Sequence, residues 1–137
     1  SREWSKRLGQ ATYPILYYFI ELQLKAGKSF IVESNFHPEY DSKSFRELGS
    51  KYDFKSLLIQ CECEGLVLYE RFLTRSNSAE RHPGHRDHLN IAEFKELLLG
   101  GELELLDIET LPYRFDTTDL DSLDHESLYD FINLIFH

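Results

Sequence analysis

Four arginines lie close together in the middle of the chain, within a stretch of sixteen residues. They are Arg71, Arg75, Arg81 and Arg86. A guanidinium group donates two parallel hydrogen bonds to phosphate oxygens, so arginines that converge from a helix and its following loop can stabilise charge on a transferring phosphoryl group. The acidic neighbours Glu70 and Glu80 favour the alternative, an ordinary solvated surface. Spacing alone leaves both interpretations open.

The loop that contains two of these arginines, ERHPGHRDH over residues 80–88, also carries three histidines. They are His82, His85 and His88. Their spacing of three would place them on one side of a helix and allow a zinc site, but Pro83 and Gly84 predict a turn instead. Cys61 and Cys63 lie 19 residues or more away, and they are weaker candidate zinc ligands than the two cysteines of a CxxC motif would be. We therefore predict no metal site.

Helices and strands alternate around these residues. The spacing of apolar residues predicts helices at 11–26, 42–52, 64–75, 91–99 and 123–136, the first with Pro14 in its first turn and Gly27 as its stop. Strands of buried type are predicted at 29–36 and 55–63, and a third strand at 113–117, whereas 102–110 fits strand or loop. Two strands with a helix between them indicate a βαβ unit, and hence an α/β fold with a parallel sheet flanked by helices.

Polar residues follow each predicted strand, where ligands bind in open parallel sheets. They are Glu33, Ser34 and Asn35 after the first strand, Cys63 and Glu64 after the second, and Asp116, Thr117 and Thr118 after the third. A carboxylate such as Glu33 can accept a proton from a substrate hydroxyl or hold Mg²⁺ through water. It can equally cap a loop or pair with a cation, and both interpretations of Glu33 stay open.

Composition and charge exclude several classes of function. The chain has 137 residues, 42% hydrophobic and 28% charged, which fits one globular domain. Residues 100–137 carry one arginine against ten acids and account for the net charge of −9, so nucleic acid is not an expected partner. The sequence has no apolar run of about 20 residues and no signal-peptide pattern. We expect a cytoplasmic protein with no membrane contact, and nothing in the sequence indicates its oligomeric state.

Several segments together resemble a known family. They are IVESNF, a second strand with cysteines, LYERFLTRSNSAERHPGHRDH and YRFDTT. This succession resembles the bacterial P-loop kinases labelled AAA-type or zeta-toxin-like predicted ATPases, from about Trp4 to Phe131. The resemblance implies the fold of P-loop nucleoside triphosphate hydrolases, ATP and Mg²⁺ as cofactors, and a small-molecule substrate. The implied reaction is phosphoryl transfer to a small-molecule or nucleotide-like hydroxyl.

The resemblance also implies roles for single residues. The implied catalytic residues are Glu33, as a base or metal-side carboxylate, and Arg71, Arg75 and Arg81, in a lid region of about 64–90. The implied nucleotide-binding residues are Arg75, Thr117 and Thr118. Asn35, His82 and His85 are expected to contact the substrate.

One defining motif of that family is missing. The sequence has no G-x-x-x-x-G-K-[ST], the loop whose backbone amides and lysine hold the phosphates. The string KAGKSF at 25–30 fails because position 22 is Leu and because it leads from a predicted helix into a predicted strand. The chain also lacks Met and starts at Ser1. We therefore expect the C-terminal portion of a single kinase-like domain, inactive alone. Its parent is then an ATP-dependent enzyme or, alternatively, a binding or regulatory module that keeps the fold for partner contact.

Overall fold

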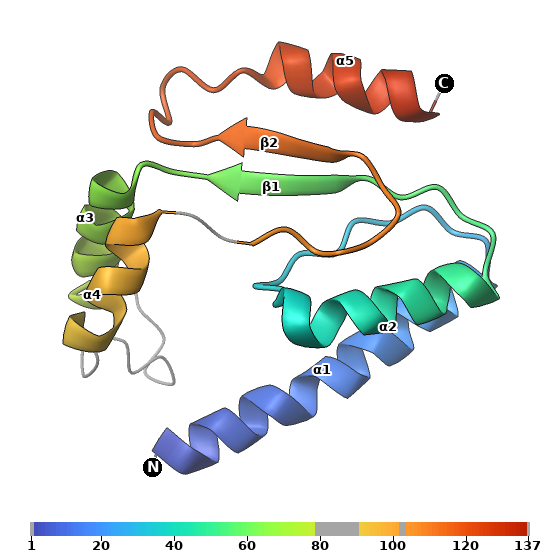
Figure 1. The fold of residues 1–137 in the computed structure, drawn as a ribbon, viewed down its shortest axis with the longest axis horizontal. Coiled ribbons are helices and arrows are strands. Elements are labelled where there is room, and N and C mark those ends of the chain that lie inside the picture. Colours follow the sequence, from blue (N-terminus) through green and yellow to red (C-terminus); the bar gives the residue numbers. More distant parts are fainter. Residues whose placement is uncertain (1, 79–90, 102–103, 137) are drawn as a thin grey trace. The chain divides into compact units, whose positions relative to one another are not determined.

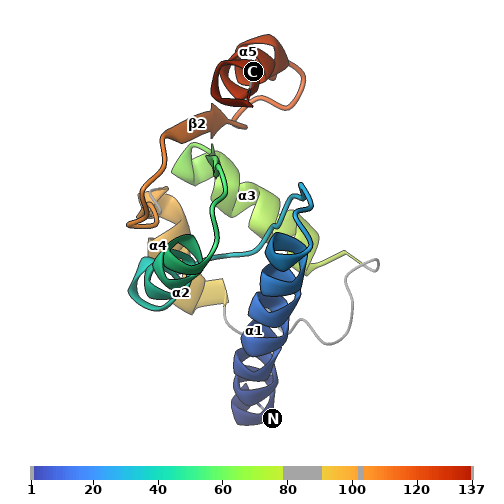
Figure 2. The same cartoon turned by 90° about the vertical axis from the view of Figure 1, so that its right-hand side faces the viewer.

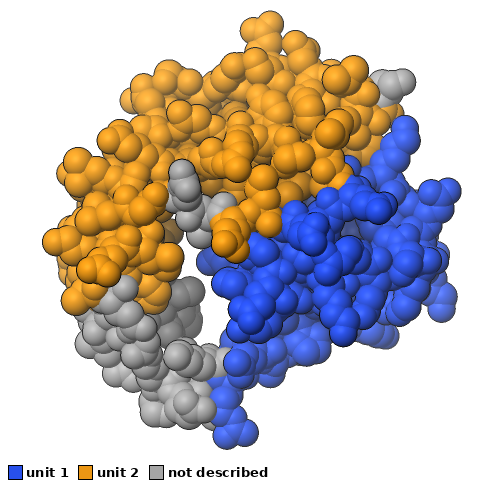
Figure 3. Space-filling view, viewed as in Figure 1, with its two compact units in different colours: residues 1–56, 106–109 blue, residues 57–105, 110–137 orange. Residues whose placement is uncertain are grey.

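The computed structural model describes residues 2–78, 91–101 and 104–136 (Figure 1). Contacts within the chain gather into two compact units, coloured separately in Figure 3. Unit 1 comprises residues 1–56 and 106–109, and unit 2 comprises residues 57–105 and 110–137. The single kinase-like domain expected from the sequence stays a prediction. No helix in the described ranges is long and apolar enough to cross a membrane.

Unit 1 is built from two helices, α1 (Arg2–Lys25) and α2 (Pro38–Lys51). Helix α1, the long blue ribbon of Figure 2, begins well before the predicted start, so Pro14 lies inside it. The first-turn position predicted for Pro14 is therefore wrong; because proline has no N–H, the helix lacks one backbone hydrogen bond there. The predicted stop is confirmed, since Gly27 adopts a φ of 62° just after the helix.

The core of unit 1 lies between these helices, where Ile20 and Leu48 are buried. A polar contact lies beside it. Asp41, only 4% exposed, accepts hydrogen bonds from the Tyr17 hydroxyl at 2.6 Å and from the His37 backbone N–H at 2.5 Å. Burial, and then the hydrogen bond to this carboxylate, raise the pKa of Tyr17 well above its usual range. Tyr17 therefore stays a hydrogen-bond donor to Asp41 throughout the physiological range.

The segment at 29–36 does not form the predicted strand. In the described residues the sheet contains two strands, at 58–62 and 112–116, and this segment has no ladder partner. A lone strand leaves its backbone N–H and C=O groups unpaired, which removes the main stabilisation of a strand. Ile31 is 98% exposed, so the predicted burial is absent too. The βαβ unit predicted to begin here is therefore wrong for this structure, although α2 is present.

Unit 2 contains the sheet, formed by β1 (Leu58–Glu62) and β2 (Pro112–Asp116). The strands run parallel, with Leu58 opposite Pro112 and Glu62 opposite Asp116. The chain passes from β1 to β2 through α3 (Gly65–Ser76) and α4 (Ile91–Gly100), and α5 (His125–Phe136) follows β2 (Figure 1). The predicted strands at 55–63 and 113–117, their parallel direction and these three helices are confirmed.

Packing around the helices of unit 2 positions the start of α3. The buried Phe72 of α3 lies 5.7 Å, ring centre to ring centre, from Phe94 of α4. The end of α4 comes so close to the start of α3 that residue 65 must lack a side chain. Gly101, just after α4, has a φ of 67°, a conformation that favours glycine. Strand β2 contacts α5 through two aromatic rings, those of Tyr113 and Phe131, whose centres lie 4.9 Å apart.

Candidate functional site

The carboxyl ends of β1 and β2 lie side by side, because the parallel register pairs Glu62 with Asp116. Beyond β1 the chain continues through Cys63 and Glu64 into α3, and beyond β2 it turns at Thr117. The polar residues that the sequence places after two of its strands are therefore neighbours. This edge is where open parallel sheets usually bind ligands.

Hydrogen bonds fix the turn that follows β2. The backbone N–H and the hydroxyl of Thr117 both donate to the Glu62 carbonyl, each at 2.7 Å. The hydroxyl of Thr118 accepts from the Glu64 backbone N–H at 2.9 Å, and the Thr118 N–H donates to the Asp116 carboxylate at 2.8 Å. Hydrogen bonds from the side chain and then the backbone of Thr118 hold the pKa of Asp116 below its usual value. Asp116 is therefore a stable anion at neutral pH.

Arg71 reaches the same turn from α3. One guanidinium nitrogen, Nη1, donates to the Thr117 carbonyl at 2.6 Å, and the other, Nη2, donates to the Thr118 carbonyl at 2.7 Å. Nη1 also lies 3.4 Å from the sulfur of Cys63. The arginine thus joins α3, the end of β1 and the turn after β2.

A pocket of about 370 Å³ opens at this edge of the sheet. Its lining residues are Glu62, Cys63, Glu64, Gly65, Gly100, Gly101, Arg114, Asp116 and Thr118. It is a shallow hollow that is open to solvent rather than an enclosed cavity. Three of its side chains are carboxylates, and its one lining arginine, Arg114, is ion-paired with Glu62. The pocket therefore offers mainly hydrogen-bond acceptors and negative charge.

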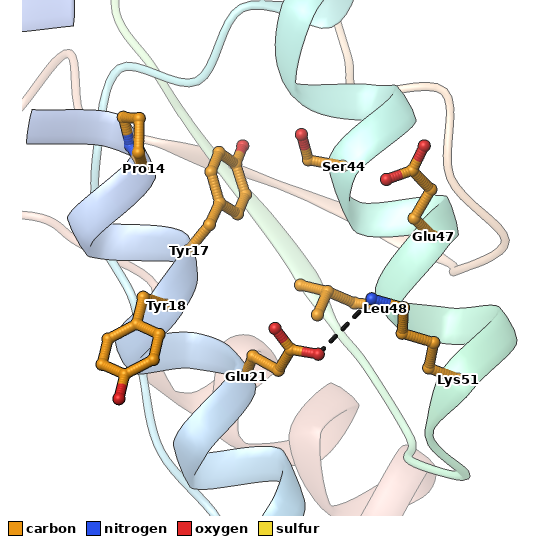
Figure 4. Close-up of a pocket in the computed structure, with 8 residues that line it drawn as sticks. All are labelled: Pro14, Tyr17, Tyr18, Glu21, Ser44, Glu47, Leu48 and Lys51. Carbon is orange, nitrogen blue, oxygen red and sulfur yellow. Dashed lines mark hydrogen bonds and ion pairs between the residues drawn. The ribbon is translucent and has the colours of Figure 1, made fainter. Parts of the chain in front are cut away.

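A second, smaller pocket of about 250 Å³ lies in unit 1, between α1 and α2 (Figure 4). Glu21 and Lys51 form an ion pair there at 3.4 Å, and the Tyr52 hydroxyl donates to Glu21 at 3.0 Å. The hydrogen bond from Tyr52, followed by the charge of Lys51, lowers the pKa of Glu21. None of the site residues predicted from the sequence lines this pocket. Because Glu21 and Lys51 already pair with each other, we give the pocket no role.

The structure brings three of the predicted site residues together, namely Arg71, Thr117 and Thr118. Arg75 lies one turn further along α3 and is exposed. Glu33 and Asn35 are exposed in the extended segment of unit 1, where the Asn35 carbonyl accepts a hydrogen bond from Tyr13 at 3.2 Å. Arg81, His82 and His85 lie outside the described residues, as does the third histidine of that loop.

Other pocket residues are missing from the sequence prediction. Glu62 and Arg114 lie within strands, and the glycines at 65, 100 and 101 form part of the lining. A signal for two of the glycines is present in the sequence, since Gly100-Gly101 directly follows the predicted helix at 91–99, but such a pair by itself indicates only the end of a helix. In the described ranges no group of three or more His, Cys, Asp or Glu side chains is arranged to hold a metal ion.

A known structure shares this fold. The crystal structure of a "putative kinase" from Chloroflexus aurantiacus J-10-fl aligns with 100% of this chain and 74% of that chain. The two are 29% identical, and the TM-score is 0.84. The fold is kinase-like. No family model matches the chain, and no curated protein matches it either.

Proposed function

We propose that the chain forms the nucleobase-binding part of an ATP-dependent phosphotransferase, which transfers a phosphoryl group to the hydroxyl of a small-molecule or nucleotide-like substrate. The observation that carries the proposal is the pocket at the carboxyl ends of β1 and β2, with its lining residue Thr118 fixed by Arg71. The likeness to the Chloroflexus protein supports it, because that protein is described as a "putative kinase".

The chemistry of the pocket suits a nucleobase better than phosphate. The carboxylates of Glu62, Glu64 and Asp116 accept hydrogen bonds, and amino groups of a base such as adenine donate them. Phosphate groups carry negative charge and would be repelled by the same carboxylates. The pocket thus suits the base of ATP better than its triphosphate.

The phosphates would have to lie elsewhere in this proposal. The 137 residues contain no phosphate-binding loop of the P-loop type, so ATP-dependent transfer requires such a loop from outside them. The remaining roles follow the resemblance: Glu33 takes the proton of the acceptor hydroxyl, and Arg75 and Arg81 stabilise the charge of the transferring group. Asn35, His82 and His85 contact the acceptor in the same proposal.

A second candidate function is a binding or regulatory module that keeps the fold for partner contact. This candidate differs from the first in that it needs no phosphate-binding loop, and the 137 residues contain none. The two candidates differ in what the pocket at β1 and β2 does. A nucleobase site binds adenosine, whereas a partner-binding module has no reason to do so.

The test is a titration of the ¹⁵N-labelled chain followed by amide NMR. We expect adenosine at millimolar concentration to shift the amides of 62–65 and 116–118, and ATP to bind no more tightly than adenosine. Replacing Glu64, which lines the pocket, by Gln should improve ATP binding relative to adenosine because one repelling charge is removed. Glu70→Gln is the matched control, since it removes the same charge from an exposed position on α3.

Two results would contradict the proposal. Adenosine that leaves the amides of 62–65 and 116–118 unmoved would exclude a nucleobase site at this pocket and favour the partner-binding module. ATP that binds at least about tenfold more tightly than adenosine, a difference of about 1.4 kcal/mol, would show that the chain recognises phosphate by itself. In that case our assignment of the phosphates to another segment is wrong.

A further inference from the structure

We infer that Arg71 is a positioning residue for the nucleobase pocket: it fixes the backbone of the Thr117–Thr118 turn and does not contact phosphate. This inference rests on the proposed function for its account of the ligand. It differs from the role that the resemblance implies, in which Arg71 stabilises charge on the phosphates. The contacts of the side chain decide between the two roles.

Both ends of the guanidinium fork are already occupied. Nη1 and Nη2 donate to two consecutive backbone carbonyls, those of Thr117 and Thr118, at 2.6 Å and 2.7 Å. Such hydrogen bonds are charge-assisted, and they use the paired geometry that would otherwise serve a phosphate. Arg71 is also half-buried, in contrast to the exposed Arg75 one turn later. Binding a phosphate would require Arg71 to release both carbonyls.

The turn that Arg71 holds carries a pocket residue into place. Thr118 lines the pocket. Its hydroxyl accepts a hydrogen bond from the Glu64 backbone N–H, and its own N–H donates to the Asp116 carboxylate. Without the fork, the carbonyls of Thr117 and Thr118 would turn to water and the orientation of Thr118 would be less restricted. A lysine at position 71 is a point charge without the planar fork, so it cannot replace both hydrogen bonds.

The experiment compares Arg71→Lys with Arg46→Lys, measuring amide hydrogen exchange and adenosine affinity by NMR. Arg46 is a matched control because its Nη1 also donates to a backbone carbonyl, that of Asp107 at 2.7 Å, but within unit 1. For Arg71→Lys we expect amide exchange at Thr117, Thr118 and Glu64 to become at least about tenfold faster, and adenosine affinity to fall about tenfold. Amides in the β1–β2 ladder should keep their protection, and Arg46→Lys should change neither quantity.

Each other outcome has a defined meaning. Unchanged exchange at the turn would overturn the inference, and so would faster exchange throughout unit 2, because that indicates general destabilisation. Inorganic phosphate titrated into the wild-type chain should leave the Arg71 side-chain signal unmoved; a phosphate-dependent shift of that signal would also overturn the inference. If the wild-type chain fails to bind adenosine but the turn loosens as expected, the proposed function fails and the positioning role of Arg71 stands.

Discussion

Gly65 lies so close to Leu99 that a β-carbon on residue 65 would stand 2.2 Å from the Leu99 carbonyl oxygen. The opposing atoms belong to the backbone of α4, which cannot turn aside as a flexible side chain can. Gly101 lies at the same contact, because a β-carbon on residue 101 would stand 3.2 Å from the backbone nitrogen of Gly65. The start of α3 and the end of α4 therefore meet through backbone, and this contact forms one wall of the pocket.

Replacing Gly65 by Ala should destabilise unit 2, because the methyl group forces the two helices apart. We expect a loss of about 1–3 kcal/mol in the free energy of unfolding, measured by urea denaturation. Gly49→Ala is the matched control. Nothing lies within 4 Å of a β-carbon on residue 49 of α2, so alanine there should stabilise by about 0.5–1 kcal/mol. Equal effects of the two variants would contradict the contact.

Replacing Tyr17 by Phe removes the hydroxyl that donates to the buried Asp41. The buried carboxylate then loses the hydrogen bond of 2.6 Å from Tyr17 and keeps the one from the His37 N–H, so we expect a loss of about 1–3 kcal/mol. Tyr18→Phe on the same helix is the control, because Tyr18 is 59% exposed. Thermal unfolding followed by circular dichroism measures both. A stability for Tyr17→Phe that equals the control would mean that this hydrogen bond contributes nothing.

The pKa of Asp116 makes the turn after β2 sensitive to acid. Because the folded-state pKa lies below the ordinary value of 3.8, its stabilising effect is present above that value and is lost as the pH falls through the folded-state pKa. Replacing Thr118 by Ala should raise the pKa of Asp116 toward 3.8, as read from its carboxyl carbon in an NMR titration. The pKa of Asp119, lowered chiefly by Ser122, should stay unchanged and serves as the internal control.

Arg75 is the described arginine that remains exposed on α3. In a form of the protein that carries a phosphate-binding loop, Arg75→Ala should lower the rate of phosphoryl transfer about a hundredfold, because one donor to the developing charge is lost. The measurement is kcat with ATP and the acceptor. Thr74→Ala, at the neighbouring exposed position whose hydroxyl bonds within the helix, is the control. A rate equal to that of wild type would remove Arg75 from the mechanism.

The helices and both strands of unit 2 could be predicted from sequence because local signals determine them. Apolar residues at helical spacing predict 64–75, and the structure has Gly65–Ser76; the strands are found within three residues of their predicted ends. The polar ends of β1 and β2 could be predicted as a site because parallel strands end at the same edge. In these cases the sequence pattern and the tertiary contacts agree.

The remaining features depend on contacts that no local pattern encodes. The carbonyls that Arg71 binds lie 46 and 47 residues along the chain, and they are backbone atoms that every residue type possesses. The close approach of Gly65 to Leu99 is likewise invisible in the spacing of either helix. The strand predicted at 29–36 is wrong for another reason. Its apolar composition indicates the surroundings that it requires, a buried place in a sheet, but not whether a neighbouring strand is present.

The exposed Ile31 affects the tendency of the chain to aggregate. Phe30, Ile31 and Val32 form an apolar, extended run with unpaired backbone, which is the kind of segment from which aggregation starts. Lys28 and Glu33 flank it and act as the charged gatekeepers that limit such association. The solubility of the chain is therefore expected to depend on these five positions more than on its net charge of −9.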